Sequence, residues 1–515
     1  MTKNLMIQGT ASSAGKSVMV AGICRILQRQ GLSAAPFKAQ NMALNSYVTA
    51  EGKEMGRAQV FQAEAAGLEP DVSMNPVLLK PSGDKGSQVI VNGEPRKHMK
   101  AGAYYEFKPQ LKGIVKRAYD QLASQHDVIV IEGAGSPAEI NLQENDIVNM
   151  GMAEMVSAPV ILVGDIERGG VFASLYGTVK LLPPEDQNRI KALLINKFRG
   201  DKKLLEPGLQ ELEEKLGIPF LGVLPYIELA LDDEDSLSER LQNKVDAPKN
   251  EEALHVNVVL LPHISNFTDF NPLEMYEGIN VNYIKSPEQV AEADVLILPG
   301  SKNTLEDRVW LRQTGFDQAI KNYAESGKLL IGVCGGFQML GSELSDPRGT
   351  ESNMRRIPGL DLLPIKTVMA ADKKTLQATG SWQYEDDRFF AGMKGLEING
   401  YEIHMGRTEL LKSDLYQPVN SNADSNRRDG DQYLNSIINS SGNILGTYWH
   451  GIFENRELTT RLINNLRGDL GRDSIASPRM DYQQLKEQEY NRLADMLEAE
   501  MDMEMLAEIV GLDLS

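Results

Sequence analysis

Short apolar strands alternate with helical patterns along most of this chain. Up to residue 231, strand-like runs such as NLMIQG, DVIVIEG and VILVGD are separated by helical segments such as VMVAGICRILQRQ. The runs HVNVVLLPHIS, ADVLILPG, KLLIGVCGG and NILGTYWHG continue the series after residue 253. Strands that alternate with helices form mostly parallel sheets with helices on both faces. The sequence therefore predicts an α/β fold with ligands beyond the carboxyl ends of the strands.

Two domains and a helical tail are expected from the order of these patterns. The chain has 515 residues, whereas one domain usually holds about 100 to 200. We predict an N-terminal domain at residues 1–231, a polar linker at 232–253, a C-terminal domain at 254–455 and a helical extension at 456–515. Leu485, Leu493 and Leu497 offer the extension a buried stripe for packing. The polar segment from Ser413 to Gly442 is predicted to be a surface loop.

Composition and charge exclude several classes of protein. The net charge is -19 at pH 7, whereas a nucleic-acid surface needs clustered Lys and Arg that release counterions. We expect neither DNA nor RNA as a partner. No apolar run approaches the roughly 18 residues of a membrane span, and no signal-peptide pattern opens the chain. The two cysteines, Cys24 and Cys334, form no disulfide framework. These features fit the reducing cytoplasm and leave the oligomeric state open.

A glycine-rich loop follows the first predicted strand. It reads GTASSAGKS at residues 9–17 and runs into a helix near Val18. In such a loop, backbone N–H groups face phosphate oxygens, the lysine reaches the terminal phosphates and the next hydroxyl binds magnesium. Thr10 stands where the strict motif has its first glycine, and Gly9 lies one residue earlier. We predict an ATP site formed by Gly9, Thr10, Ser13, Gly15, Lys16 and Ser17.

An acidic residue at the end of a neighbouring strand would hold or orient the magnesium ion. DVIVIEGAG provides Glu132 directly after an apolar run, and Asp165 at the end of VILVGD is a second candidate. Alone, each would be interpreted as a solvated carboxylate at a strand end. Beside a phosphate loop, Glu132 is the better partner for Ser17, so we predict Ser17 and Glu132 as ligands of nucleotide-bound Mg²⁺. No permanently bound cofactor is expected.

Cys334 lies in a turn rich in glycine. The segment KLLIGVCGGFQML places it between an apolar strand and a helix, with Gly332, Gly335 and Gly336 around it. A nucleophile elbow needs small neighbours because the turn is sharp, and it leaves the side chain projecting above the sheet. Backbone N–H groups at Gly335 and Gly336 could then receive an oxyanion. A lone cysteine is usually an inert apolar residue, but this setting predicts a nucleophile.

His450 is the predicted base for Cys334. It follows the last strand of the second domain, in ILGTYWHGIFEN, and a cysteine nucleophile needs a group that takes and returns protons. His404 in GYEIHMGRT is the competing candidate, and we expect a substrate-binding or structural role for it. The other histidines lie in loops or at strand starts, at His98, His126, His255 and His263.

Several strings resemble known families. GVCGGFQ followed by a distant YWHG resembles the class I glutamine amidotransferases, in which cysteine and histidine cleave glutamine through a γ-glutamyl thioester. The N-terminal domain resembles dethiobiotin synthetase, and the fusion of the two resembles the cobyrinate amidases. FKAQNMALNS, EGAGSPAEINL, DIERGGVFASLYGT, NKFRGD, ISNFTDF and LPGSKNT carry the same resemblance, which spans nearly the whole chain.

The resemblance implies a glutamine-dependent amide ligase of cobalamin synthesis, with ATP, glutamine and a corrinoid as its partners. ATP would convert a corrinoid carboxylate to an acyl phosphate, and ammonia from glutamine would displace the phosphate. The strings EGAGSPAEINL and DIERGGVFASLYGT favour amidation of the b, d, e and g carboxylates of adenosylcobyrinic acid a,c-diamide. The alternative is the earlier reaction of the same group, which makes the a,c-diamide.

The resemblance also implies roles for particular residues. The loop at Gly300 would form part of the oxyanion hole. Cys334 and His450 would act as a dyad, because Ile452 occupies the place of the usual third residue and the nearest acid is Glu454. Candidate contacts to the corrinoid are Asn41, Asn45 and Ser136.

A function of another class also fits the phosphate loop. The chain could be a P-loop switch protein of the partitioning type that carries an inactive amidotransferase domain. Such switches often have an extra lysine near the start of the loop, and none lies between Gly9 and Gly15. The presence of both Cys334 and His450 also favours an enzyme.

Overall fold

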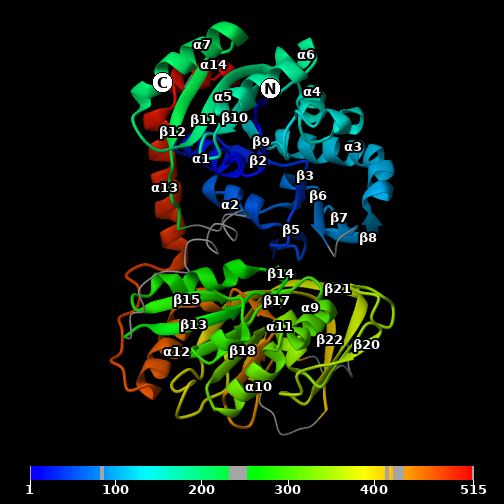
Figure 1. The fold of residues 1–515 in the computed structure, drawn as a ribbon, viewed down its shortest axis with the longest axis vertical. Helices are drawn as coiled ribbons and strands as arrows, with labels where there is room; N and C mark the ends of the chain where they lie inside the picture. The colour runs from blue at the N-terminus through cyan, green and yellow to red at the C-terminus, as the bar shows by residue number, and fades with distance from the viewer. Residues whose placement is uncertain (1, 82–85, 231–251, 412–416, 422–433, 513–515) are drawn as a thin grey trace.

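The chain folds into two α/β bodies stacked along the long axis of the molecule (Figure 1). The computed structural model describes residues 2–81, 86–230, 252–411, 417–421 and 434–512. Most of the predicted linker lies outside these residues, as does much of the polar segment after Ser413. The first body contains the blue to green elements up to residue 230 and the second the green to orange ones from residue 252, while the two red C-terminal helices return to the first body.

The first body is built on a six-stranded parallel sheet with the order β12-β11-β10-β1-β9-β2. Its strands are β1 (Lys3–Gly9), β2 (Ala34–Phe37), β9 (Val128–Glu132), β10 (Val160–Asp165), β11 (Ile190–Phe198) and β12 (Phe220–Pro225). Side chains alternate between the two faces of a strand. In β1, Leu5 and Ile7 therefore pack into one apolar layer and Met6 into the other. The predicted parallel α/β sheet is confirmed.

Helices cover both faces of this sheet. One face packs against α1 (Lys16–Arg29), α13 (Tyr482–Glu500) and α14 (Met503–Val510). The other packs against α3 (Ala101–Ala123), α4 (Met150–Val156), α5 (Val171–Leu181) and α7 (Glu206–Leu216). A short α6 (Pro184–Gln187) joins α5 to β11. Across the described ranges, no helix has the length and apolar character needed to cross a bilayer.

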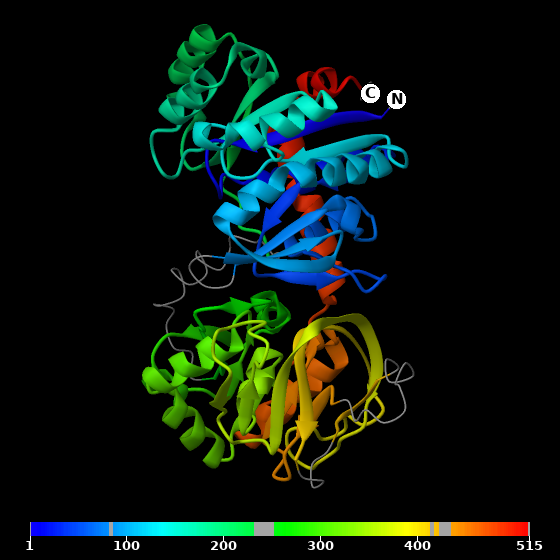
Figure 2. The same ribbon diagram turned by 90° about the vertical axis from the view of Figure 1, so that its right-hand side faces the viewer.

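Between β2 and α3 the chain forms a smaller unit on the side that faces the second body (Figures 1 and 2). It contains the sheet β3-β6-β7-β8, the hairpin β4–β5 and helix α2. The bounds are β3 (Gln40–Met42), β4 (Ser46–Val48), β5 (Glu54–Gly56), α2 (Arg57–Ala65), β6 (Val77–Pro81), β7 (Gly86–Val91) and β8 (Glu94–Lys100). The sequence did not predict this unit, because its strands are short and lack the strand-helix alternation.

The second body has its own sheet, with the order β15-β13-β16-β18-β25-β24. The strands are β13 (Leu254–Val259), β15 (Ile279–Ile284), β16 (Val295–Leu298), β18 (Leu329–Val333), β24 (Ser436–Ile438) and β25 (Ile444–Thr447). All pairs are parallel except β24 with β25. Its principal helices are α9 (Thr304–Gln313), α10 (Phe316–Glu325), α11 (Gly335–Leu340) and α12 (Arg456–Asp469).

A second sheet in this body runs mostly antiparallel, in the order β20-β19-β21-β22-β26. The strands are β19 (Glu343–Ser345), β20 (Arg356–Pro358), β21 (Ile365–Trp382), β22 (Glu397–Leu410), β23 (Val419–Ser421) and β26 (Trp449–His450). β23 pairs with the end of β21. The prediction that Ser413 to Gly442 is only a surface loop is therefore wrong for β23 and β24. In β24, Ile437 and Ile438 are buried at the sheet edge within an otherwise polar stretch.

The predicted helical extension is confirmed, but its parts belong to different bodies. Helix α12 packs into the core of the second body, whereas α13 crosses back and lies on α1. Leu493 and Leu497 are fully buried there, while Leu485 is only half-buried. The two helices approach closely because residue 22 is glycine: a Cβ at Gly22 would lie 2.2 Å from Cδ1 of Leu497.

Leu497→Ala should reveal how strongly α13 stabilises the first body. Removing this fully buried side chain is expected to lower the free energy of unfolding by about 2–5 kcal/mol, because it leaves a cavity against α1. The matched control is Leu485→Ala on the same helix, which should cost much less. Urea denaturation followed by circular dichroism measures both, and equal losses at the two positions would contradict this packing.

Candidate active site

The loop between β1 and α1 has the backbone of a phosphate cradle. Gly15 caps α1 with φ 92°, in the left-handed region that favours glycine. A Cβ there would lie 2.1 Å from Nδ2 of Asn196, so no other residue fits without a rearrangement. Lys16 Nζ donates hydrogen bonds to the carbonyl oxygens of Ala11 at 2.8 Å and Gly135 at 3.1 Å. The lysine thus folds over the loop where terminal phosphates would bind.

Glu132 is buried next to this loop and accepts short hydrogen bonds from three side chains, besides a longer one from Gln59. Ser17 Oγ donates to Oε1 at 2.8 Å, Lys38 Nζ lies 2.9 Å from the same oxygen, and Gln62 Nε2 donates to Oε2 at 2.6 Å. Burial alone would raise the pKa of Glu132, but the charge and hydrogen bond of Lys38, with the other two donors, bring the pKa below its usual value. Glu132 is therefore ionised at neutral pH.

The oxygen atoms of Ser17 and Glu132 suit a hard cation such as Mg²⁺. The structure brings these two predicted ligands together. In the part of the chain that the structure describes, no group of three or more His, Cys, Asp or Glu residues could hold a metal. Magnesium that relies on one carboxylate takes its other ligands from water and nucleotide phosphates. Asp165, the second candidate, instead lies 3.3 Å from Lys197 Nζ.

Two of the three candidate corrinoid contacts connect to the phosphate site. Asn41 Nδ2 donates to Gln59 Oε1 at 3.0 Å, and Gln59 Nε2 lies 3.4 Å from Glu132 Oε2. Ser136 follows Gly135, whose carbonyl oxygen accepts a hydrogen bond from Lys16. Asn45 is buried just before β4, and its Oδ1 finds no hydrogen-bond partner among the described residues.

Cys334 occupies the sharp turn between β18 and α11. Its φ of 51° and ψ of -105° lie outside the regions that non-glycine residues prefer. The glycines that follow are required by close contacts. A Cβ at Gly336 would lie 2.0 Å from the carbonyl oxygen of Leu298, and one at Gly335 would lie 2.7 Å from the backbone nitrogen of Ser301. The predicted elbow is therefore present, with the cysteine at its apex.

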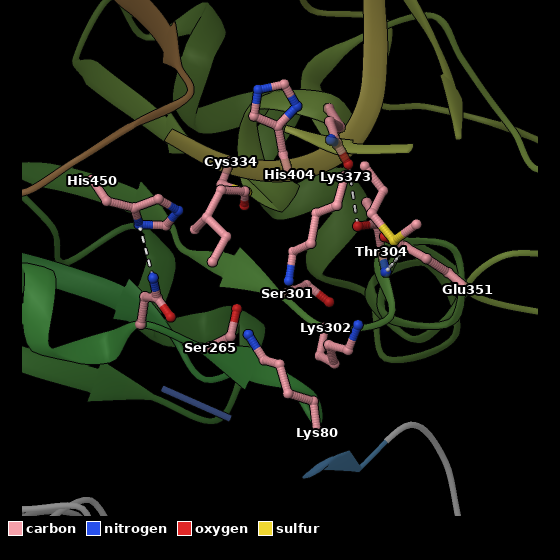
Figure 3. A pocket seen from close by; sticks show the side chains of 14 residues that line it. Lys80, Ser265, Ser301, Lys302, Thr304, Cys334, Glu351, Lys373, His404 and His450 are labelled. Carbon is pink, nitrogen blue, oxygen red and sulfur yellow. Dashed lines mark hydrogen bonds between the residues drawn. The ribbon is translucent and has the colours of Figure 1, made fainter. Parts of the chain in front are cut away.

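His450 lines the same pocket as Cys334, and Figure 3 shows the two on one side of it. His450 Nδ1 lies 2.6 Å from Oδ2 of Asp269, and the backbone N–H of Gly451 donates to the other oxygen of that carboxylate. Nε2 is buried and has no hydrogen-bond partner within the described ranges. Burial opposes protonation of His450, but the charge and hydrogen bond of Asp269, with Cys334, raise its pKa to about 10.

The expectation that His450 lacks an acidic partner is wrong. Asp269 supplies the carboxylate from the η4 segment (Phe267–Met275), far from His450 in sequence. Glu454, the nearest acid along the chain, instead lies 3.8 Å from Arg57 of the first body. Ile452 is buried where the family pattern would have its third residue. The string ISNFTDF contains Asp269, but its spacing from His450 gave no sign of contact.

Gly300 and His404 border the pocket in different ways. Gly300 begins β17 (Gly300–Ser301), which pairs with β14 (Ile264–Ser265). A Cβ at Gly300 would lie 3.6 Å from Cε1 of His450. His404 stacks on Tyr448 with a centroid distance of 3.7 Å, and its Nδ1 lies 2.8 Å from the carbonyl oxygen of Gly406. Burial lowers the pKa of His404, so it is neutral and fixed by its neighbours.

Three lysines line the pocket opposite Cys334 and were missed from the sequence (Figure 3). Lys80 comes from β6 of the first body, while Lys302 and Lys373 come from the second. Burial lowers the pKa of Lys302 to about 8 and that of Lys373 to about 7. Glu54 of the first body binds two of them, at 2.9 Å from Lys80 and 2.5 Å from Lys373. The pocket is therefore closed by residues of both bodies.

Comparisons with known proteins agree with the division of the chain into two bodies. Residues 5–237 match the CobQ/CobB/MinD/ParA nucleotide binding domain, and residues 255–458 match the CobB/CobQ-like glutamine amidotransferase domain. Fold and site thus define a glutamine amidotransferase joined to a nucleotide-binding domain.

Curated relatives over nearly the whole chain share one name. Proteins called cobyric acid synthase from Alkaliphilus metalliredigens (strain QYMF) and Streptococcus sanguinis (strain SK36) are 48% and 46% identical to it. The alignments cover 98% and 99% of this chain and 99% of each relative. The chain belongs to the cobyric acid synthase family, and the resemblance inferred from its motifs is confirmed.

Asp269→Asn should lower the pKa of His450, since it removes the charge that raises it. The folded protein holds this proton more tightly than the unfolded chain, where histidine titrates near 6.5. The resulting stability is fully present below pH 6.5 and is lost as the pH rises toward 10. In Asp269→Asn, the loss of stability with rising pH should be smaller. NMR titration of the His450 ring measures the shift, with Glu454→Gln as the control; an unchanged titration in Asp269→Asn would contradict the assignment.

Proposed function

We propose that this chain amidates the b, d, e and g carboxylates of adenosylcobyrinic acid a,c-diamide to give adenosylcobyric acid. It would use ATP to activate each carboxylate and glutamine as the source of ammonia. One observation carries the proposal: in a chain of this family, Cys334 and His450 line a pocket that the ATP-binding body helps to close, and Asp269 holds His450 from behind. A switch protein with an inactive amidotransferase domain would have no use for that set.

In the glutamine reaction, Cys334 Sγ forms a bond to the side-chain carbonyl carbon of glutamine. The oxyanion is received by backbone N–H groups at Gly335, Gly336 and the Gly300 loop. The carbon–nitrogen bond then breaks, and His450 gives its proton to the departing ammonia. Because Asp269 keeps His450 protonated at neutral pH, the acid is ready when the amide is attacked. Water next cleaves the thioester, with His450 as base, and releases glutamate.

In the ATP reaction, a corrinoid carboxylate oxygen attacks the γ-phosphorus and ADP leaves. The carboxylate alone is a poor acyl donor, since oxide would have to leave it. Residues 9–17 position the phosphates, with Gly9, Thr10, Ser13 and Gly15 shaping the loop. Lys16 stabilises charge on the transferred group, and Mg²⁺ held by Ser17 and Glu132 would neutralise phosphate charge. Ammonia then attacks the acyl carbon and displaces phosphate.

The remaining assignments follow from this chemistry. Residues 1–231 would be the carboxylate-activating domain, 254–455 the amidotransferase domain and 232–253 their linker. Asn41, Asn45 and Ser136 would contact the corrinoid beside the phosphate site. A reaction that consumes ATP and depends on a free thiol fits the cytoplasm.

Incubation of the purified a,c-diamide with protein, ATP, Mg²⁺ and glutamine tests the proposal by mass spectrometry. Masses should rise in single-amide steps to the hexaamide, with one ATP consumed for each amide. With ¹⁸O in the carboxylates, one label should pass to phosphate for every amide, because the acyl phosphate carries a carboxylate oxygen. Activity on cobyrinic acid but not on its diamide would favour the earlier reaction of the pathway. Amidation without transfer of label would rule out the acyl phosphate.

Cys334→Ser should abolish synthesis from glutamine and leave synthesis from high ammonium largely intact. Only the ammonia source depends on the thiolate, whereas ATP activation takes place in the other body. Amide formation with each nitrogen source is measured in parallel, and Cys24→Ala, at the buried cysteine of α1, serves as the control. A folded Cys334→Ser protein that is inactive with ammonium would contradict the division into two sites.

Lys16→Ala should stop amide formation from either nitrogen source. The loop lysine acts on ATP, and loss of a group that stabilises transition-state charge typically costs on the order of a hundredfold or more in rate. Steady-state assays with glutamine and with ammonium measure the loss. Lys112→Ala, an exposed lysine on α3, should change neither rate, and near-normal turnover of Lys16→Ala would disprove the phosphate site.

A further inference from the structure

Three residues form a closed hydrogen-bond circuit across the boundary between the two bodies. The backbone N–H of Ser46 donates to Asn266 Oδ1 at 3.3 Å, Asn266 Nδ2 donates to the Tyr401 hydroxyl at 3.2 Å, and that hydroxyl donates to the Ser46 carbonyl oxygen at 3.4 Å. All three residues are buried. Ser46 belongs to the first body and the other two to the second, so two of the three hydrogen bonds cross the boundary.

This circuit lies directly against His450. The rings of Tyr401 and His450 stack with centroids 5.2 Å apart and planes 19° from parallel. The two residues are also paired across β22 and β26. Asn266 Nδ2 lies 3.5 Å from His450 Nδ1, the nitrogen that faces Asp269. The orientation of the His450 ring is therefore set on one side by Asp269 and on another by the circuit.

The other end of the circuit leads to the phosphate site. Ser46 pairs with Gly56 in the β4–β5 hairpin, and α2 begins at the next residue. From α2, Gln62 Nε2 donates to Glu132, which also accepts a hydrogen bond from Ser17 of the phosphate loop. The β4–β5 hairpin and helix α2 thus connect the surroundings of His450 to the ATP site.

We propose that Tyr401 is a positioning residue that makes the orientation of His450 depend on the β4–β5 hairpin of the first body. This inference rests on the proposed function. Because Ser46 supplies both a donor and an acceptor, a displacement of the hairpin opens two hydrogen bonds at once and frees the Tyr401 ring. Binding of ATP and corrinoid next to α2 fixes the hairpin, and glutamine is cleaved efficiently only when an acceptor for ammonia is ready.

Tyr401→Phe tests this role, because it removes the hydroxyl and keeps the ring that stacks on His450. Glutamate and amide are measured together, with and without ATP, Mg²⁺ and the a,c-diamide. The wild-type protein should release about one glutamate per amide, and its glutaminase rate should rise when the other substrates are added. In the variant, the rise should shrink several-fold and glutamate per amide should increase several-fold. Synthesis from ammonium should not change.

Two further variants separate positioning from a general loss of structure. Asn266→Gly removes the side-chain hydrogen bonds to Ser46 and Tyr401, together with the 3.5 Å contact to His450. Glycine suits the left-handed backbone at φ 53°, so this variant should act at least as strongly as Tyr401→Phe. Tyr276→Phe is the control, because this buried hydroxyl contacts Thr460 and the Arg456 carbonyl away from the first body.

The outcomes distinguish this inference from the proposed function. If Tyr401→Phe shows the wild-type stimulation of glutaminase and the wild-type ratio of glutamate to amide, the positioning role is overturned and the proposed function is not. An equal fall of glutaminase with and without the other substrates would also overturn it, since it would reveal only a structural role. If the wild-type protein fails to amidate the a,c-diamide, the proposed function fails and the inference fails with it.

Discussion

A buried carboxylate, Glu132, organises the first body around its phosphate loop. A charge that is removed from water is tolerated only when it is paired and hydrogen-bonded. Lys38, Gln62 and Ser17 meet this requirement from three separate segments. The strand end, the loop after β2, helix α2 and the start of α1 are therefore fixed relative to one another by one side chain. The nucleotide site and the unit that faces the second body share this anchor.

The second body has a comparable arrangement around Cys334. The strained backbone at Cys334 persists because Gly335 and Gly336 allow the turn to press against β16 and β17. The Asp269 carboxylate sits beneath His450 and fixes which ring nitrogen faces the pocket. Both sites thus combine a glycine turn at a strand end with a buried acid that orients its partner, although the acids come from unrelated parts of each body.

Local patterns made much of this architecture predictable. The parallel strands, the loop with Lys16 and the elbow at Cys334 each lie within a short stretch, where apolar runs and glycine spacing reflect the backbone directly. Asp269 and Lys38 could not be assigned in this way, because their partners lie far away in sequence and polar contacts carry no periodicity. The long β21–β22 hairpin escaped notice for a related reason: the middle of β21 reads ADKKTLQ and lacks the regular alternation of apolar and polar residues that marks a strand. The family resemblance supplied roles for Cys334 and His450 but did not indicate Asp269 as the third member of the set.

The return of α13 to the first body has a consequence for the order of folding during synthesis. Domains generally begin to fold from the N-terminus while the ribosome is still extending the chain. The apolar side of α1, including Ile23 and Gly22, is covered by Leu493 and Leu497, which are made only after every strand and helix of the second body. Until they emerge, the first body exposes that surface to water and to other chains. The nucleotide-binding half, although encoded first, is thus completed only after the amidotransferase half has been synthesised.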